Sequence, residues 1–206
     1  MKKRIYAFDF DGTLTTRDTL IAFIRYAKGT RAFVLGFLLH AHLLVLMKLK
    51  LYPNWKAKQK IFSYFFKGMS LGDFDALCQH FVADNRQLLR PEGIRTLEQA
   101  RADGADIVIV SASIDNWVKP FFTSPDGLAD NLPPQVTVLG TQIEIAGGKL
   151  TGHFLTKNCY GPEKVNRILD LYPDRCAYHL TAYGDSRGDK ELLAFADESH
   201  YKPFRS

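Results

Sequence analysis

Asp9 and Asp11 are the residues of this chain whose type and spacing most clearly suggest chemistry. They follow an apolar run at residues 5–8, which predicts a buried strand. Successive residues of a strand alternate between its two faces, so carboxylates two positions apart would point the same way. Because adjacent negative charges repel, such a pair is stable when a cation joins it or one acid stays protonated. Gly12 lets the backbone turn and approach a ligand closely, although Asp-Gly is also an ordinary turn pair.

Ser111 follows a second apolar strand, predicted at residues 106–110. Its hydroxyl could donate a hydrogen bond to a phosphate oxygen, assisted by the backbone N–H groups of Ala112 and Ser113. The alternative is that these serines only cap the helix that follows. We expect phosphate binding for Ser111 and favour helix capping for Ser113.

Lys164 falls in the first turn of a helix that Gly161 and Pro162 are expected to open. The helix dipole disfavours a cation there by roughly 0.3–1 kcal/mol, and an anion bound at that end would reverse the penalty. A surface lysine whose charge reaches into water is the alternative. The position favours a lysine that faces a bound anion.

Asp185 and Asp189 lie in a loop at residues 184–189, after a strand predicted at residues 177–183. Asp185 is placed to supply a further carboxylate to a metal. Asp189 has two explanations, because it is either an outer residue of the metal site or, with Ser186, part of a capping box. Carboxylate oxygens of this kind suit Mg2+, which proteins usually hold by one or two carboxylates together with phosphate and water.

Predicted strands and helices alternate along most of the chain, which indicates an α/β fold whose parallel sheet is covered on both faces. Ligands of such sheets sit at the carboxyl ends of the strands, where the Asp9, Ser111 and Asp185 motifs are expected. Two runs, residues 136–145 and 149–155, are expected to form a hairpin.

The domain organisation follows from an interruption of this alternation. Residues 16–89 are predicted to be helical throughout and to form an inserted cap domain. Residues 1–15 and 90–206 would then form the catalytic core.

These four elements, in this order, resemble the four signatures of the haloacid dehalogenase-like hydrolases, a superfamily made up largely of phosphatases. The helical insertion resembles the subgroup that includes phosphoserine phosphatases. The resemblance implies a Rossmann-like core and a Mg2+-dependent hydrolase of phosphate monoesters that acts through an aspartyl-phosphate. It implies Asp9 as the nucleophile and Asp11 as the acid and base, whereas dehalogenases of the superfamily lack the second acid.

The resemblance also implies which residues bind the phosphate and the metal. Asp11 would contribute to the metal site through its main-chain carbonyl. The phosphate or substrate ligands would be Gly12, Ser111, Ala112 and Lys164, and the metal residues Asp9, Asp11, Asp185 and Asp189.

The substrate is expected to be selected by the cap, where residues 32–47 form an apolar run with only His40 and His42 titratable. As one helix this run would be about 24 Å long, short for a hydrocarbon core of about 30 Å. It would lie in the interface of a bilayer, with lysines on anionic headgroups, or be buried inside the cap bundle.

Together with residues 158–164, this run resembles the phosphatidylglycerophosphatase C-type branch, whose members dephosphorylate a lipid phosphate. The alternative is a phosphoserine phosphatase-like enzyme for a small soluble phosphomonoester. Asp18 could stand for the acidic cap residue of those enzymes, but no arginine occurs between Arg31 and Arg86. A more distant alternative is a non-catalytic module that binds phosphate or membrane.

The charge and the cysteine content limit which partners and which cellular compartment we expect. The net charge is +5, and the segment between Thr19 and Gly72 holds nine basic residues and no acidic one. Such a block suggests attraction to an anionic surface or substrate, or simply a solvated helical face. Three widely spaced cysteines fit a reducing cytoplasm. The two early aspartates interrupt any secretion signal, so we expect a cytoplasmic protein, in peripheral contact with the membrane if the lipid assignment holds, and no nucleic-acid partner.

Overall fold

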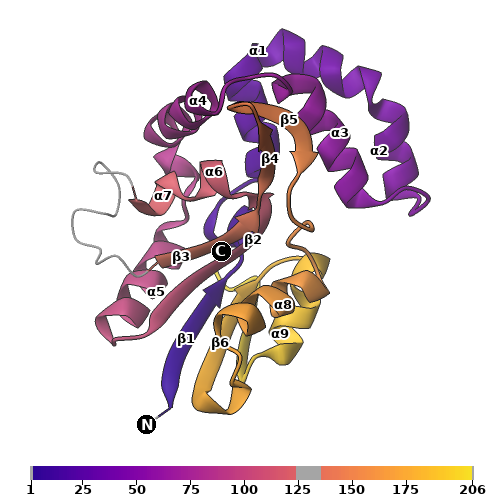
Figure 1. The fold of residues 1–206 in the computed structure, drawn as a ribbon. Coiled ribbons are helices and arrows are strands. Elements are labelled where there is room, and N and C mark those ends of the chain that lie inside the picture. Colours follow the sequence, from indigo (N-terminus) through magenta and orange to yellow (C-terminus); the bar gives the residue numbers. More distant parts are fainter. Residues whose placement is uncertain (1, 124–135, 206) are drawn as a thin grey trace.

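The computed structural model describes residues 2–123 and 136–205. Within them, five parallel strands form one sheet in the order β3-β2-β1-β6-β7 (Figure 1). The first strand of the chain is therefore central, and the predicted α/β class is confirmed. The strands are β1 (Lys3–Phe8), β2 (Asp106–Ile114), β3 (Val136–Thr141), β6 (Tyr178–Gly184) and β7 (Glu198–Tyr201).

Both faces of the sheet are buried, as the apolar strands require. Ile5 and Ala7 of β1 pack in one cluster with Ile168 and other residues from α8 and α9. Phe8 points to the opposite face and packs in a second cluster with Leu97 of α5. Helices therefore cover the sheet on both sides, as parallel sheets need. The helices of this part are α5 (Pro91–Ala102), α6 (Asp115–Val118), α7 (Pro120–Thr123), α8 (Pro162–Leu171) and α9 (Lys190–Phe195).

Residues 16–89 contain four α-helices, in line with the helical segment predicted there, and these helices pack around aromatic side chains. Phe23 lies within 5.4 Å of Phe66 and within 5.3 Å of Phe81, measured between ring centroids. Trp117 of α6 stacks on Phe23 at 4.9 Å, so the aromatic cluster continues into the sheet part of the molecule. The four helices are α1 (Thr19–Leu39), α2 (Ala41–Lys48), α3 (Asn54–Phe66) and α4 (Leu71–Asp84).

The apolar run at residues 32–47 does not form the single helix that was expected. It breaks at His40, and α1 and α2 meet there at an angle of 60°. Burial inside the cap bundle is also wrong, because α2 has no buried residue and Leu38 is 67% exposed. Within the described residues no single helix is long and apolar enough to cross a membrane; α1 and α2 together reach that length and composition, but they are bent.

The predicted strand at residues 136–145 is divided at Gln142. β3 joins the parallel sheet, and only β4 (Ile143–Ala146) pairs with β5 (Lys149–Phe154) as the expected hairpin. This hairpin is bonded to the helical segment, since Gly68 donates from its backbone N–H to the Leu150 carbonyl at 2.8 Å. Gly152 allows close contact with α3, because a Cβ there would lie 2.4 Å from Ser63 Oγ.

Candidate active site

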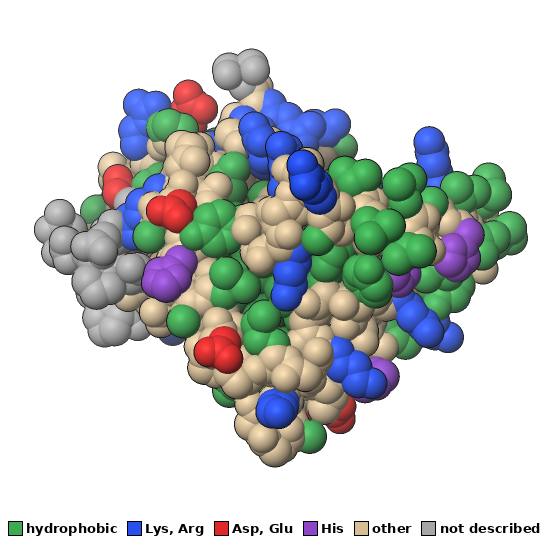
Figure 2. Space-filling view, turned by 90° about the horizontal axis from the view of Figure 1, so that it is seen from above, with side chains coloured by type: hydrophobic (Ala, Val, Ile, Leu, Met, Phe, Trp, Pro, Cys, Tyr) green, Lys and Arg blue, Asp and Glu red, His purple; other side chains and the backbone are tan. Residues whose placement is uncertain are grey.

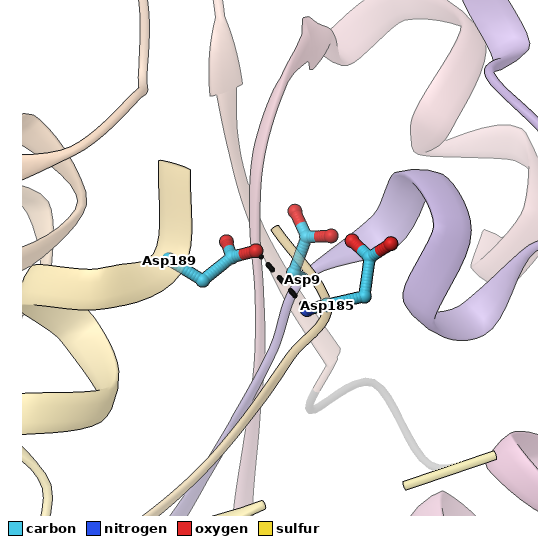
Figure 3. Close-up of side chains that lie close together, drawn as sticks. All are labelled: Asp9, Asp185 and Asp189. Atoms are coloured by element: carbon cyan, nitrogen blue, oxygen red, sulfur yellow. Dashed lines mark hydrogen bonds between the residues drawn. The ribbon is translucent and has the colours of Figure 1, made fainter. Parts of the chain in front are cut away.

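The sheet topology brings the two acidic motifs together at one edge of the sheet. β1 and β6 are neighbours, with Phe8 paired to Tyr183, and the backbone N–H of Asp9 donates to the Tyr183 carbonyl at 2.9 Å. Asp9 and Asp185 therefore leave adjacent strands at their carboxyl ends, the usual place for a ligand of a parallel sheet. In Figure 3, the carboxyl groups of Asp9, Asp185 and Asp189 approach one another between these segments.

Lys164 is the positive centre of this group. Its Nζ lies 2.5 Å from Asp9 Oδ1 and 2.6 Å from Asp189 Oδ1, and its side chain is buried. Burial disfavours the charged ammonium, but the two carboxylates outweigh it and raise the pKa of Lys164. The anion expected at this helix start is thus, in part, the protein's own pair of aspartates.

Asp189 forms the capping box that was one of its two predicted roles, while its role at a metal site stays a prediction. Its Oδ2 accepts hydrogen bonds from Ser186 N at 2.9 Å and Ser186 Oγ at 2.8 Å, which forms the predicted capping box. The same oxygen accepts from Asp185 N at 3.2 Å, drawn as the dashed line in Figure 3. Burial acts to raise the pKa of Asp189, yet Lys164 and these donors hold it below its usual range.

The three acids fit a divalent cation. Each of Asp9, Asp185 and Asp189 offers an oxygen, and the three oxygens lie within 4.8 Å of one another. Asp185 Oδ1 is buried and has no hydrogen-bond partner among the described residues, while Arg205 pairs with its Oδ2. Hard carboxylate oxygens in this number suit Mg2+. Both oxygens of Asp189 already accept hydrogen bonds, and so do those of Asp9, from Lys164 at Oδ1 and from Thr13 at Oδ2. Among the described residues, Asp185 Oδ1 is therefore the carboxylate oxygen of the three acids that has no protein partner.

Asp11 lines the same cavity as Asp9, but its carboxyl group has a different set of partners. β1 ends at Phe8, and the turn that follows directs Asp11 toward α1. Its Oδ1 accepts from Thr19 N at 2.7 Å and Thr19 Oγ1 at 2.6 Å, and its Oδ2 accepts from Ser113 Oγ at 2.5 Å. The side chain is therefore held apart from the three grouped acids by neutral donors.

Gly12 occupies a position that only glycine fits without strain. Its φ is +81°, and a Cβ built on it would lie 2.5 Å from Asp185 Oδ2. The turn that contains Asp11 and Gly12 therefore packs directly against Asp185 of the second acidic motif. The approach to a ligand that was expected of Gly12 stays a prediction.

The serine motif is only partly at the cavity. Ala112 and Ser113 line it, whereas Ser111 is buried and is not among the lining residues. Ser111 Oγ accepts a hydrogen bond from Ser113 N at 3.0 Å, so phosphate binding by Ser111 stays a prediction. The helix cap favoured for Ser113 is wrong, because Ser113 lies within β2 and its hydroxyl donates to Asp11.

Three cations that line the cavity were not identified from the sequence, namely Arg17, Lys58 and Arg205. Lys58 reaches in from α3 and donates a hydrogen bond to the Ala112 carbonyl; burial lowers its pKa, while Asp11 and Asp18 oppose that effect. The sequence did contain a signal for Lys58, because it follows Ala57 and precedes Ile61 by three residues. This spacing puts Lys58 near the buried side of α3. Arg205 comes from the end of the described chain and had no local signal.

The cavity has a volume of about 500 Å³ and two kinds of wall. The acids, Lys58 and Lys164 form the polar end. The opposite wall comes from the helical segment and is apolar, being lined by Leu20, Phe37, Leu44, Met47 and Ile61. The arrangement can therefore hold a charged group against the polar end and an apolar group against the helical segment.

Comparison with known proteins places this site in a family. A model of the haloacid dehalogenase-like hydrolases matches residues 6–194. The chain is 36% identical to Protein CicA of Caulobacter vibrioides over 205 residues, which are 98% of this chain and 86% of that protein.

Two solved structures share the fold. A protein of unknown function from Bordetella pertussis Tohama I is 19% identical, with a TM-score of 0.79 over 97% of this chain and 89% of its own. A phosphoserine phosphatase, as a phospho-aspartyl intermediate analogue, is 18% identical, with a TM-score of 0.61 over 97% and 86%. The family match includes all four motifs, and the expectation of a phosphatase-type enzyme is confirmed at the level of family and fold. This chain belongs to the haloacid dehalogenase-like hydrolases.

Proposed function

We propose that this chain hydrolyses phosphate monoesters through an aspartyl-phosphate, with Asp9 as the nucleophile and Asp11 as the acid and base. The observation that supports this most directly is the separation of the two carboxyl groups. Asp9 is buried against Lys164, whereas Asp11 accepts hydrogen bonds from Thr19 and Ser113 at the cavity. Different environments are what allow two carboxyl groups of one site to take different protonation states.

The reaction has two steps. An oxygen of Asp9 attacks phosphorus, the bond to the ester oxygen breaks, and the leaving alkoxide takes a proton from Asp11. Asp11, now ionised, removes a proton from a water molecule that attacks the phosphorus of the acyl phosphate. Inorganic phosphate leaves, and both carboxyl groups return to their starting states.

Mg2+ is the proposed cofactor, held by Asp9, by Asp185 and, as the family resemblance implies, by the main-chain carbonyl of Asp11. Burial raises the pKa of Asp9 to about 7, an effect that Lys164 opposes and Asp189 and Asp11 reinforce. When bound, the ion supplies positive charge that favours the ionised nucleophile and balances the charge of the phosphoryl oxygens. Asp189 serves this site by holding Lys164 and the backbone of the Asp185 loop.

The substrate is proposed to be a phosphomonoester with an apolar tail, a lipid phosphate such as phosphatidylglycerophosphate. The apolar wall of the cavity, which includes Phe37, Leu44 and Met47, supports this choice because it would lie beside whatever extends from the phosphate. An enzyme for such a lipid phosphate is proposed to lie in the cytoplasm, in contact with an anionic membrane.

A small soluble phosphomonoester, such as phosphoserine, is the second candidate. Asp18 and Lys58 both line the cavity, and together they could bind the ammonium and carboxylate of an amino acid. Lys58 would then take the place of the arginine that the sequence lacks in this segment.

Initial rates with Mg2+ test both candidates. The substrates are phosphatidylglycerophosphate in mixed micelles, phosphoserine and an aryl phosphate, and Asp9→Asn is the control. The lipid proposal requires that the lipid have the highest kcat/KM and that Asp9→Asn lose turnover of all three. A higher kcat/KM for phosphoserine selects the second candidate. No turnover of the aryl phosphate by the wild type would favour a non-catalytic binding module instead.

A further inference from the structure

The outer side of the helical segment carries an apolar surface that no described part of the chain covers. It extends from the last turns of α1 over α2 to the loop before α3, and Leu51 within it is 72% exposed. Figure 2 shows hydrophobic side chains gathered at the end of the molecule where α2 lies in Figure 1, with basic and histidine side chains among them. We call this the apical surface; its members are Leu35, Leu38, Leu39, Val45, Leu49 and Leu51.

The charge around the apical surface is of one sign. Lys48, Lys50 and Lys56 are exposed beside it, and the segment between Thr19 and Gly72 contains no acidic residue. A second copy of this chain would bring two such basic segments together, and like charges at an interface repel. An occupant that is apolar inside and negatively charged outside matches both properties, as the surface of an anionic bilayer does.

The same two helices connect the apical surface to the cavity. Phe37 lies in sequence between the exposed Leu35 and Leu38 of α1, yet it lines the cavity. Leu44 and Met47 of α2 also line the cavity. These helices are therefore apolar on the side of the site and on the side of solvent, whereas a helix with two apolar sides is usually buried.

We propose that the apical surface binds the interface of an anionic bilayer, with α1 and α2 lying between the lipid and the active site. Binding of the bilayer stands on the exposed residues alone. The further consequence, that a lipid phosphate enters the cavity past Phe37 and Leu44, rests on the proposed function.

Trp55 provides a direct probe of this binding. The chain has two tryptophans, and Trp117 is buried, whereas Trp55 is 44% exposed at the start of α3, close in sequence to Leu51. Vesicles of phosphatidylcholine and phosphatidylglycerol are expected to shift the emission of Trp55 to shorter wavelength. Pure phosphatidylcholine vesicles should shift it less, and Trp55→Phe should remove the change. An identical response to both vesicle types would contradict the role of the basic residues.

Co-sedimentation with the same vesicles tests the surface itself. Leu38→Ser/Leu51→Ser is expected to weaken vesicle binding roughly 10- to 100-fold, because two leucines lose their transfer to an apolar environment. Leu171→Ser, an exposed position on α8, is the matched control and should bind as the wild type does. Equal binding by the double variant and the control would overturn the proposal.

Turnover of a soluble aryl phosphate separates this inference from the proposed function. The double variant should retain that turnover, because neither leucine lines the cavity. If the wild type has normal turnover but does not bind vesicles, the proposal that the apical surface binds a bilayer is refuted, and the phosphatase assignment stands. A wild-type dimer that the double variant converts to a monomer in sedimentation velocity, again without vesicle binding, would instead show that a second copy occupies the surface.

Discussion

Lys164 is the residue on which the arrangement of the clustered acids depends most. It is buried between Asp9 and Asp189 and is bonded to both. A buried charge is stable only when it is paired, and here one cation balances two carboxylates. Removing it would leave two negative charges facing each other in a buried place.

We therefore expect Lys164→Met to lower the free energy of unfolding by about 3–5 kcal/mol as well as to abolish phosphatase activity. Urea denaturation monitored by circular dichroism measures the first effect. Arg95→Met is the control, because Arg95 pairs with Glu92 at the surface and such pairs contribute only about 0–1 kcal/mol. A Lys164 variant as stable as the Arg95 variant would show that the aspartates do not need this cation.

At the scale of elements, the hairpin of β4 and β5 joins the sheet part of the chain to the helical segment. The hairpin follows β3 in sequence, yet its backbone bonds to Gly68 and Leu71 after α3. Gly152 of β5 lies against Ser63 of α3 and has a φ of +87°. The contact is thus specified by a residue without a side chain, which no apolar pattern would reveal.

Gly152→Ala is expected to destabilise the protein by about 1–3 kcal/mol more than Gly148→Ala, since its Cβ would overlap Ser63. Gly148 is the control because its φ of +73° imposes similar backbone strain, but a Cβ there meets nothing within 4 Å. Thermal or urea unfolding of both variants measures the difference. Ser63→Gly should recover part of the loss in the Gly152 variant, and no recovery would place the strain elsewhere.

At the scale of the whole molecule, binding of a divalent ion should raise the free energy of unfolding of the protein. Mg2+ at about 100 times its Kd adds about 2.7 kcal/mol, which for a chain of this size raises Tm by about 5–10 °C. Differential scanning calorimetry should show this rise, and EDTA should reverse it. Asp185→Asn is expected to remove the effect, whereas Asp170→Asn, an exposed position on α8, should keep it. An unchanged rise in the Asp185 variant would exclude that carboxylate as a ligand.

Much of this molecule could be predicted from local sequence, because its motifs directly follow apolar strands. The meeting of Asp9 and Asp185 at one edge of the sheet needed only the rule that parallel strands end together. Lys164 lies instead in the first turn of α8 and was predicted from the helix dipole. The hydrogen-bond partners of Asp11 could not be predicted, because β1 ends at Phe8 and Asp11 lies in the turn that follows. Lys58 required the packing of α3 over the sheet, a contact between segments far apart in sequence.

The central position of β1 has a consequence for how the chain folds during synthesis. Ile5 pairs with Asp106 on one side and with Leu180 on the other, so the first strand leaves the ribosome long before either neighbour exists. Contacts between such distant residues form slowly. The helices that follow β1 contact one another locally, and we expect them to become compact first. Even after β2 has been made, one side of this apolar strand would stay unpaired until β6 follows, a stage at which chaperones can be needed.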